Sequence, residues 1–207
     1  MEERQIHSEE PLQTNQLDET VKNSILPYLK DLAKVLTVVL VLFLFCFRIA
    51  IVEGSSMYDT LVDGDYILLL NNFLDGEPEY GDIIVASKSA YKDGEPIIKR
   101  VIATEGQVVD IDYATGEVIV DGIVLDEPYI HSATVQIVNP QTFPLTVPEG
   151  CLFVMGDNRG KSLDSRSTTI GLIDRREVVG TALFLIFPGN DDGNEERQFN
   201  RIGVISQ

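Results

Sequence analysis

Three short segments of the sequence combine polar side chains with the apolar residues expected of β-strands. Residues 54–61 are Gly-Ser-Ser-Met-Tyr-Asp-Thr-Leu, residues 98–102 are Ile-Lys-Arg-Val-Ile, and residues 155–166 are Met-Gly-Asp-Asn-Arg-Gly-Lys-Ser-Leu-Asp-Ser-Arg. Serine and lysine side chains can serve as nucleophile and base, and carboxylates can orient them. These segments are therefore the candidate site.

Lys99 is the unusual residue of the second segment, because strand alternation places it on one face with Ile97 and Val101. One interpretation is an edge lysine whose stem is buried and whose ammonium reaches water, beside a solvated Arg100. The other is a desolvated lysine that acts as the base for a serine. Lowering its pKa from about 10.4 to about 7 requires roughly 4.6 kcal/mol of preference for the neutral amine.

The composition disfavours other functional classes. His7 lies near the N-terminus and nothing around His131 marks a general base, so we do not expect a histidine-based triad. One cysteine and one histidine beyond the apolar N-terminal run are too few for a zinc-type site, and we expect neither a metal nor another cofactor. The net charge of −17 argues against a protein that binds nucleic acid by neutralising its phosphates.

An apolar run near the N-terminus predicts a membrane-spanning helix. Residues 35–47 carry no charge, and residues 49–52 extend the run with Arg48 as its single interruption. A bilayer core about 30 Å thick requires roughly 20 residues, so we expect the span at residues 32–51. A cleaved signal peptide, a lipoprotein signal and a buried core helix fit less well, because no small-residue cleavage site follows and the run is uniformly apolar.

The basic residues that flank the predicted span set its orientation. Lys22, Lys30 and Lys34 precede the uncharged run of residues 35–47, whereas the next basic residue after Arg48 is Lys88. Basic residues are retained on the cytoplasmic side, so we expect residues 1–31 to form a cytoplasmic tail and residues 52–207 to form an extracytoplasmic domain. The protein would be a single-pass protein of the cell membrane, in contact with membrane lipids.

The rest of the chain predicts a mainly β domain. Short apolar runs separated by turn signals predict strands at residues 67–70, 82–86, 97–103, 108–111, 151–155 and 178–187. Within residues 118–125, Asp121-Gly122 stands between two apolar triplets, which predicts a two-residue β-hairpin turn. The run at 178–187 is long enough to cross the middle of a sheet. We expect a single antiparallel β domain.

In this order behind a membrane anchor, the three segments resemble the bacterial type I signal peptidases, peptidase family S26, over about residues 30–187. The resemblance implies that Ser56, directly before a methionine, is the nucleophile and that Lys99 is the general base. It also implies an antiparallel β domain of the signal-peptidase and repressor-protease type, with one N-terminal transmembrane helix. The implied enzyme is a monomeric serine endopeptidase that cleaves signal peptides of secreted preproteins after a small residue.

The last motif of that family, Gly-Asp-Asn-x-x-x-Ser-x-Asp-Ser-Arg, matches residues 156–166. The resemblance implies that Ser162 hydrogen-bonds the lysine, and that the backbone N–H of Ser56 stabilises the oxyanion. Gly54 stands where some members have a serine hydroxyl as a second oxyanion donor, so a backbone group is expected to replace it. The supporting residues are Ser162, Gly54, Asp157, Asp164, Arg166 and Arg100, with an Asp164–Arg166 ion pair, and the substrate-binding residues are Met57 and Tyr58.

One departure from the family pattern lies next to the nucleophile. The family commonly has proline where this chain has Asp59. Proline fixes φ, so its loss is expected to loosen the turn, and a carboxylate near Lys99 would favour the charged amine.

Three alternatives share part of the pattern. A self-cleaving repressor-type protease has the same serine and lysine, but the anchor and the lack of a DNA-binding segment disfavour it. A non-catalytic signal-peptidase-like protein for surface-polymer assembly would lack Ser56 or Lys99, and both are present. A tethered β-module for an external ligand leaves the joint match unexplained.

Overall fold

The computed structural model describes residues 14–88, 91–190 and 197–205. The first 13 residues of the predicted cytoplasmic tail lie outside the described part of the chain. The chain divides into two compact units, Met1–Phe45 and Cys46–Gln207. The second unit contains every strand of the described residues and is called the β domain below.

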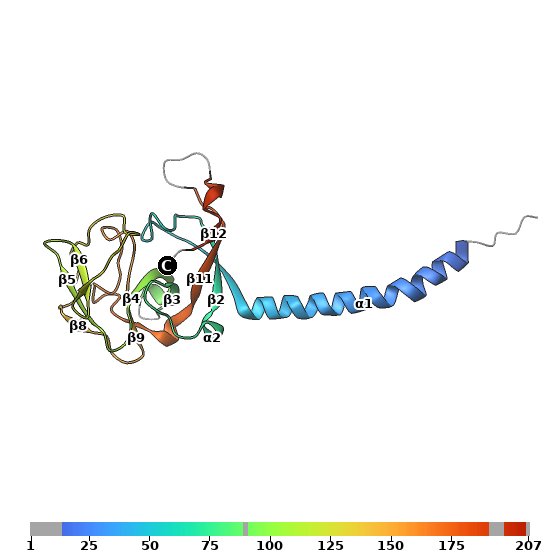
Figure 1. The fold of residues 1–207 in the computed structure, drawn as a ribbon, viewed down its shortest axis with the longest axis horizontal. Helices are drawn as coiled ribbons and strands as arrows, with labels where there is room; N and C mark the ends of the chain where they lie inside the picture. Colours follow the sequence, from blue (N-terminus) through green and yellow to red (C-terminus); the bar gives the residue numbers. More distant parts are fainter. Residues whose placement is uncertain (1–13, 89–90, 191–196, 206–207) are drawn as a thin grey trace, which may run out of the picture. The chain divides into compact units, whose positions relative to one another are not determined.

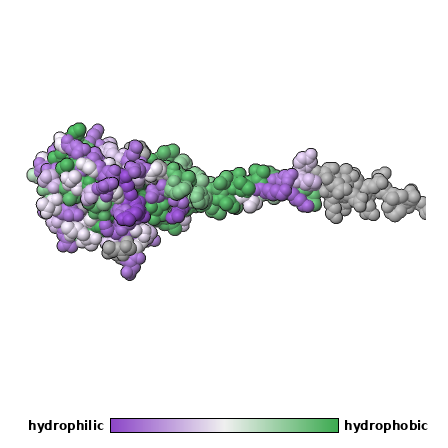
Figure 2. All heavy atoms as spheres, turned by 90° about the horizontal axis from the view of Figure 1, so that it is seen from below, coloured by the Kyte–Doolittle hydropathy of each residue, from purple (hydrophilic) through white to green (hydrophobic). Residues whose placement is uncertain are grey.

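The N-terminal unit contains a helix, α1 (Thr14–Cys46), whose side chains from Val35 to Phe45 are exposed. Figure 2 shows these hydrophobic residues as a continuous stretch of the helix, preceded by more hydrophilic ones. Within the described ranges, no helix has both the length and the apolar composition that a membrane crossing requires.

The predicted span of residues 32–51 extends too far along the chain. Its last five residues form strand β1 (Phe47–Ile51), which pairs antiparallel with β2 (Tyr66–Asn71). Ile49 and Ile51 are β-branched residues that favour a strand, and the pairing with β2 supplies backbone partners that a helix would not need. This end of the prediction was therefore wrong.

The β domain is built on an eight-stranded sheet with the order β1-β2-β11-β3-β4-β9-β10, in which β12 also pairs with β11. All of its pairings are antiparallel, as predicted. Its further strands are β3 (Ile83–Ser87), β4 (Pro96–Ala103), β9 (Cys151–Met155), β10 (Ile173–Asp174), β11 (Val178–Phe187) and β12 (Gly203–Val204). The ten-residue β11 lies inside the sheet, between β2 and β3, so the predicted central strand is confirmed.

A second, four-stranded sheet has the order β7-β6-β5-β8. Its strands are β5 (Val108–Asp112), β6 (Glu117–Val120), β7 (Ile123–Val124) and β8 (Leu145–Thr146). Asp121 and Gly122 connect β6 to β7 with φ values of 50° and 80°, which confirms the predicted hairpin turn. Figure 1 shows this sheet at the end of the β domain remote from β2 and β11.

The short elements were not predicted. They are the helix α2 (Asn72–Asp75), the 3-10 turns η1 (Lys92–Gly94), η2 (Arg175–Glu177) and η3 (Phe199–Arg201), and the two-residue strands β8, β10 and β12. Two to four residues are too few to show a periodic pattern, so the local sequence does not predict these elements.

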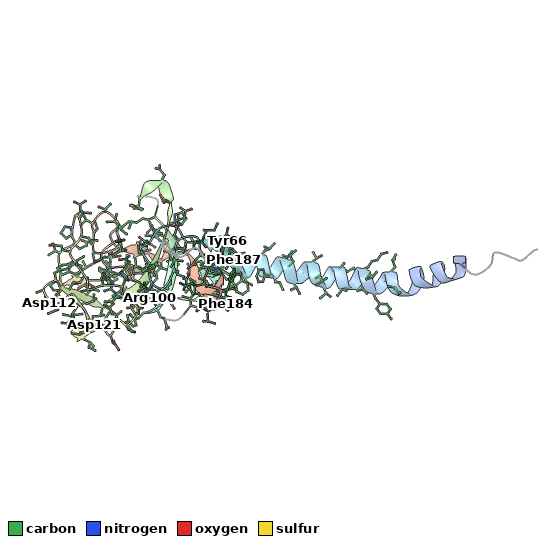
Figure 3. All side chains as sticks on the ribbon, turned by 90° about the horizontal axis from the view of Figure 1, so that it is seen from above. Tyr66, Arg100, Asp112, Asp121, Phe184 and Phe187 are labelled. Atoms are coloured by element: carbon green, nitrogen blue, oxygen red, sulfur yellow. The ribbon has the colours of Figure 1, made fainter. Side chains whose placement is uncertain are left out.

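Strand β4 brings the second candidate segment to the centre of the β domain, between β3 and β9. Residues 99–103 are all buried, and apolar side chains of β3 and β9 pack on both sides of them. The side chain of Arg100 lies inside the domain, between the Tyr66–Phe187 contact and Asp112 and Asp121 of the smaller sheet (Figure 3). Because β4 is not an edge strand, the edge-lysine interpretation of Lys99 is wrong.

Candidate active site

Ser56 and Lys99, which are 43 residues apart, meet in the β domain. Lys99 Nζ lies 2.8 Å from Ser56 Oγ and also donates to the carbonyl oxygen of Ile98 at 2.8 Å. Lys99 lies in the buried part of β4 and is only 5% exposed, whereas Ser56 is half-buried. The contact joins a potential nucleophile to a potential base, and the half-buried serine remains accessible to solvent.

Burial lowers the pKa of Lys99 from 10.5 to about 8. Desolvation is the main cause, because a low-dielectric environment disfavours the ammonium. The carboxylates of Asp164 and Asp157 act in the opposite direction, and the Arg166 guanidinium lowers the pKa further. The pKa therefore stays above the value of about 7 that the sequence suggested for a base, because two buried carboxylates favour the charged amine.

Arg100 anchors the strand that carries Lys99. Its Nε and Nη2 donate to the two oxygens of Asp157 at 2.9 and 2.8 Å, and Nη1 donates to the Gly81 carbonyl at 2.8 Å. Its guanidinium carbon also lies 4.0 Å from the ring centre of Tyr129. All of its nitrogens thus have partners, and Arg100 acts on the lysine through the strand and not by direct contact.

The third segment also holds the backbone around Ser56. Asn158 donates from its side chain to the Ser55 carbonyl at 3.1 Å and from its backbone to the Ser56 carbonyl at 3.0 Å. Thr60, four residues after the serine, donates from Oγ1 to Asp157 Oδ2 at 2.5 Å. Asp157 and Asn158 therefore connect the serine segment to the lysine strand. Sequence reasoning included Asn158 in the motif without giving it a role.

Gly156 is needed because the backbone of Ser56 and the side chain of Ser162 approach it closely. A Cβ at position 156 would lie 2.4 Å from the Ser56 carbonyl oxygen and 2.3 Å from Ser162 Oγ. The Ser162 hydroxyl is buried and has no hydrogen-bond partner within the described part of the chain. The expected hydrogen bond from Ser162 to Lys99 is thus not formed in this structure.

Asp164 and Arg166 form a fully buried ion pair. Arg166 donates from Nε to Asp164 Oδ1 and from Nη2 to Asp164 Oδ2, both at 2.8 Å. Asp164 also accepts from the Gly156 backbone at 3.1 Å, and Arg166 donates to the carbonyls of Arg159 and Ser162 at 2.9 and 3.3 Å. The pair fixes the path of the third segment between Gly156 and Ser162.

A cavity of about 650 Å³ opens beside the serine and the lysine. Residues 48–56 line one part of it, and residues 95–99 line another. Leu69, Val85, Leu163 and Val179 add apolar side chains to the lining, and Tyr91 and Lys161 complete it. The surface of the cavity is more apolar than polar and ends at two reactive groups, so it can hold an extended peptide.

Met57 and Tyr58 do not line this cavity. Met57 is 1% exposed and packs in the core with Leu61. The Leu61 N–H donates to the Met57 carbonyl at 2.9 Å, in a tight turn that directs Met57 inward. Tyr58 lines a separate cavity of about 190 Å³ and contacts the His131 ring edge-on. The predicted substrate contacts of these two residues are therefore not supported.

Gly54 has a φ of 82°, a conformation that favours glycine. Its N–H donates to Asp63 Oδ1 at 2.7 Å, so this amide already has a partner. A Cβ at position 54 would meet no atom within 4 Å, and backbone conformation therefore explains the glycine better than crowding does.

The expected effect of Asp59 on the lysine was wrong. Asp59 Oδ2 lies 3.1 Å from His131 Nδ1, both side chains are exposed, and the carboxylates that raise the pKa of Lys99 are Asp164 and Asp157. The Asp59 carboxylate is directed to His131, and this contact lies on the exposed side of the turn. His131 therefore has a specific partner, which the sequence around it did not indicate.

Two ion pairs near the site, each with a buried carboxylate, were missed. Asp65 binds Arg201, and Arg159 binds Glu127 and Thr134. Asp65 stands directly before an apolar strand, which is a weak signal of a buried carboxylate, but the distance of 136 residues to Arg201 gives no pattern at all.

Comparison with known proteins identifies the family of this chain. The family model described as signal peptidase, peptidase S26, matches residues 25–187. The chain is 34% identical to signal peptidase I of Bacillus licheniformis over 82% of this chain and 92% of that protein. It is 35% identical to signal peptidase I T of Bacillus subtilis strain 168 over 84% of this chain and 93% of that protein.

A crystal structure of a signal peptidase I from Enterococcus faecalis V583 is 32% identical, with a TM-score of 0.41, and the match covers 51% of this chain and 97% of that one. The extent of the family match and the identity to relatives along nearly their whole length settle the family. The chain belongs to the signal peptidase family, peptidase S26.

Proposed function

We propose that this protein is a signal peptidase I that uses Ser56 as nucleophile and Lys99 as general base to cleave signal peptides from exported preproteins. The observation that carries the proposal is the 2.8 Å contact between Lys99 Nζ and Ser56 Oγ, formed by a lysine that is almost fully buried. The names of the relatives, signal peptidase I, support the substrate class.

The first half-reaction transfers the proton of the serine to the lysine. In its neutral form, the Lys99 amine accepts the hydroxyl hydrogen while Ser56 Oγ attacks the carbonyl carbon of the scissile peptide bond. With a pKa of about 8, about a tenth of the amine is neutral at pH 7. When the C–N bond breaks, the Lys99 ammonium returns the proton to the leaving amine, and an acyl ester on Ser56 remains.

The second half-reaction repeats the proton transfer with water. The neutral amine takes a proton from a water molecule that attacks the ester, and the ammonium returns the proton to Ser56 Oγ as the signal peptide leaves. The backbone N–H of Ser56 is the proposed oxyanion donor. The Gly54 N–H is not proposed for this role, because it already donates to Asp63.

The preference for a small residue before the cleaved bond is also part of the proposal. The cavity beside Ser56 has apolar side chains in its wall and is bounded on one side by residues 48–56. An extended peptide in it would present its side chains to the wall, and small side chains allow its carbonyl carbon to approach Ser56 Oγ. One chain supplies both Ser56 and Lys99, so we propose a monomeric enzyme.

We further propose that α1 attaches the enzyme to the cell membrane, with its N-terminal side in the cytoplasm and the β domain outside. The support is the run of exposed apolar side chains from Val35 to Phe45 and the lysines at positions 30 and 34 before it. Extraction of the membrane fraction with alkaline carbonate tests the attachment, because only embedded protein stays with the lipid. Release of the protein by carbonate would contradict it.

The catalytic proposal is tested with purified full-length protein and a preprotein that carries a signal peptide. Mass spectrometry of the product should show cleavage after a small residue. Ser56→Ala and Lys99→Met should each reduce kcat/KM by about 10³-fold or more, without loss of folded structure by circular dichroism. The rate should rise with pH through a midpoint of about 8, because the neutral amine is the active form.

Two matched variants separate this effect from general damage. Ser132→Ala changes an exposed serine that does not line the cavity, and Lys88→Met changes a lysine that bonds the Leu172 carbonyl outside the cavity. Both should retain cleavage within about threefold of the wild type. Full activity of Lys99→Met would refute the mechanism.

A further inference from the structure

A buried carboxylate joins the end of the nucleophile segment to the C-terminal part of the chain. Asp65 is 0% exposed, and its two carboxylate oxygens accept hydrogen bonds from three residues. The Val62 N–H donates at 2.8 Å and the Gly189 N–H at 2.7 Å. Arg201 donates from Nη1 at 2.9 Å and from Nη2 at 2.6 Å, so the charged pair is bidentate.

The same guanidinium reaches further toward the serine. Arg201 Nη2 also donates to the Thr60 carbonyl at 3.2 Å. The side chain of Thr60 donates to Asp157. Asp157 in turn binds Arg100, the residue that follows Lys99 in β4. Arg201 and Asp157 thus hold the turn after the nucleophile from two sides, and through Asp157 that turn is connected to the strand of the base.

The segment that carries Arg201 is anchored in the β domain. The strand β12 lies beside β11 (Figure 1). Gly203 pairs with Leu185, and the Ile205 N–H donates to the Leu183 carbonyl at 3.0 Å. Ile205 packs against the core cluster that contains Met57. This segment follows the part of the chain, residues 25–187, that matches the family model.

We propose that Arg201 is a positioning residue of the peptidase: it holds the turn of residues 57–65 so that Ser56 Oγ stays within reach of Lys99. The inference rests on the proposed function of Ser56 and Lys99. Arg201 does not line the cavity beside the serine, so it acts through the Thr60 carbonyl and the Asp65 carboxylate. Its loss should reduce the rate of the chemical step more than the binding of the preprotein.

The principal test compares Arg201→Ala with Arg197→Ala in the full chain. Arg197 is the matched control, because it lies in the same segment but donates to the Pro188 carbonyl and stacks over Phe187. Arg201→Ala should reduce kcat about tenfold with KM within about twofold, since a small misplacement of a reacting group is costly. Arg197→Ala should keep both constants within about twofold.

Chemical rescue distinguishes positioning from general stabilisation. The Arg201 side chain is 18% exposed and lines a cavity of about 190 Å³, so a small cation can enter the space that Arg201→Ala leaves. Guanidinium ion at millimolar concentration should restore kcat of Arg201→Ala at least threefold and should not accelerate the wild type or Arg197→Ala. Should Arg201→Ala fail to fold, Arg201→Lys replaces it and should show a severalfold lower kcat with an unchanged circular dichroism spectrum.

A second readout does not depend on cleavage. Hydrogen–deuterium exchange of the backbone amides at residues 57–65 should become faster in Arg201→Ala and stay unchanged in Arg197→Ala. Unchanged exchange there, or an unchanged kcat in an active enzyme, would overturn the positioning role. Lack of cleavage by the wild type would instead refute the proposed function, and the exchange result would still decide whether Arg201 holds the turn.

Discussion

Asp157 binds Arg100 through two parallel hydrogen bonds, and both side chains are 1% exposed. The pair connects the third segment to strand β4, directly beside Lys99. Because Asp157 also accepts from Thr60, one carboxylate fixes both the strand of the proposed base and the turn after the proposed nucleophile. The supporting residues of this site therefore act mainly on the positions of two backbone segments.

The first prediction concerns this buried pair. Asp157→Asn keeps the side-chain volume but leaves the Arg100 guanidinium buried without a counter-charge, so the free energy of unfolding should fall by about 3–5 kcal/mol. Urea denaturation measures the change. Arg176→Ala removes a pair with Asp174 in which the arginine is 89% exposed, and should leave the free energy of unfolding close to that of the wild type. Equal effects of the two variants would contradict the prediction.

The second prediction compares two glycines of the third segment. In Gly156→Ala the new methyl group would clash with the Ser56 carbonyl and the Ser162 side chain, so the Ser56 backbone must shift. The free energy of unfolding should fall by about 1–3 kcal/mol, and kcat/KM should fall about 100-fold. In Gly160→Ala the nearest atom is 3.7 Å away, and both quantities should stay close to those of the wild type. A fully active Gly156→Ala enzyme would show that the contact does not position Ser56.

The third prediction distinguishes the roles of two serines of the third segment, Ser162 and Ser165. The Ser162 hydroxyl is buried without a partner, so Ser162→Ala should leave the free energy of unfolding unchanged or raise it by about 1 kcal/mol. If the hydroxyl orients the Lys99 amine during the reaction, kcat should fall about tenfold. Ser165 Oγ accepts from the Val154 N–H and donates to the Gly171 carbonyl, so Ser165→Ala should lower the free energy of unfolding by about 1–3 kcal/mol. Wild-type kcat in Ser162→Ala would remove Ser162 from the mechanism.

The fourth prediction follows from the lowered pKa of Lys99. At pH 7 the folded protein holds a desolvated ammonium that the unfolded chain leaves in water, so the native pKa of about 8, against 10.5, destabilises the fold. Lys99→Met should therefore raise the free energy of unfolding at pH 7 by an amount on the order of 3 kcal/mol.

The pH dependence of the stabilisation by Lys99→Met is the control for the fourth prediction. Between pH 8 and pH 10.5 the native lysine loses its proton while the unfolded lysine keeps it, so the destabilisation by Lys99, and with it the advantage of Lys99→Met, should decline in this window. Denaturation of the wild type, Lys99→Met and the exposed-lysine variant Lys161→Met at pH 7, 9 and 10.5 measures it. A gain that does not depend on pH would assign the stabilisation to packing instead.

Much of the fold follows from local patterns in the sequence. Strands such as β4 and β11 consist of apolar runs bounded by turn residues, and the β6–β7 hairpin needs positive φ at Asp121 and Gly122, so their local sequences predict them. Strand β1 was taken as the end of a helix, because an apolar run of its length fits either structure and only its pairing with β2 decides.

The sequence by itself determined the candidate nucleophile and base, the antiparallel β class and the family resemblance, because these depend on residue types in a fixed order along the chain. Tertiary structure alone decided that Met57 belongs to the core, that Asp59 turns to His131 and that Arg201 reaches Asp65. The physical reason is that burial and ion pairing depend on distances in space, and folding brings together residues whose separation along the chain carries no periodic signal.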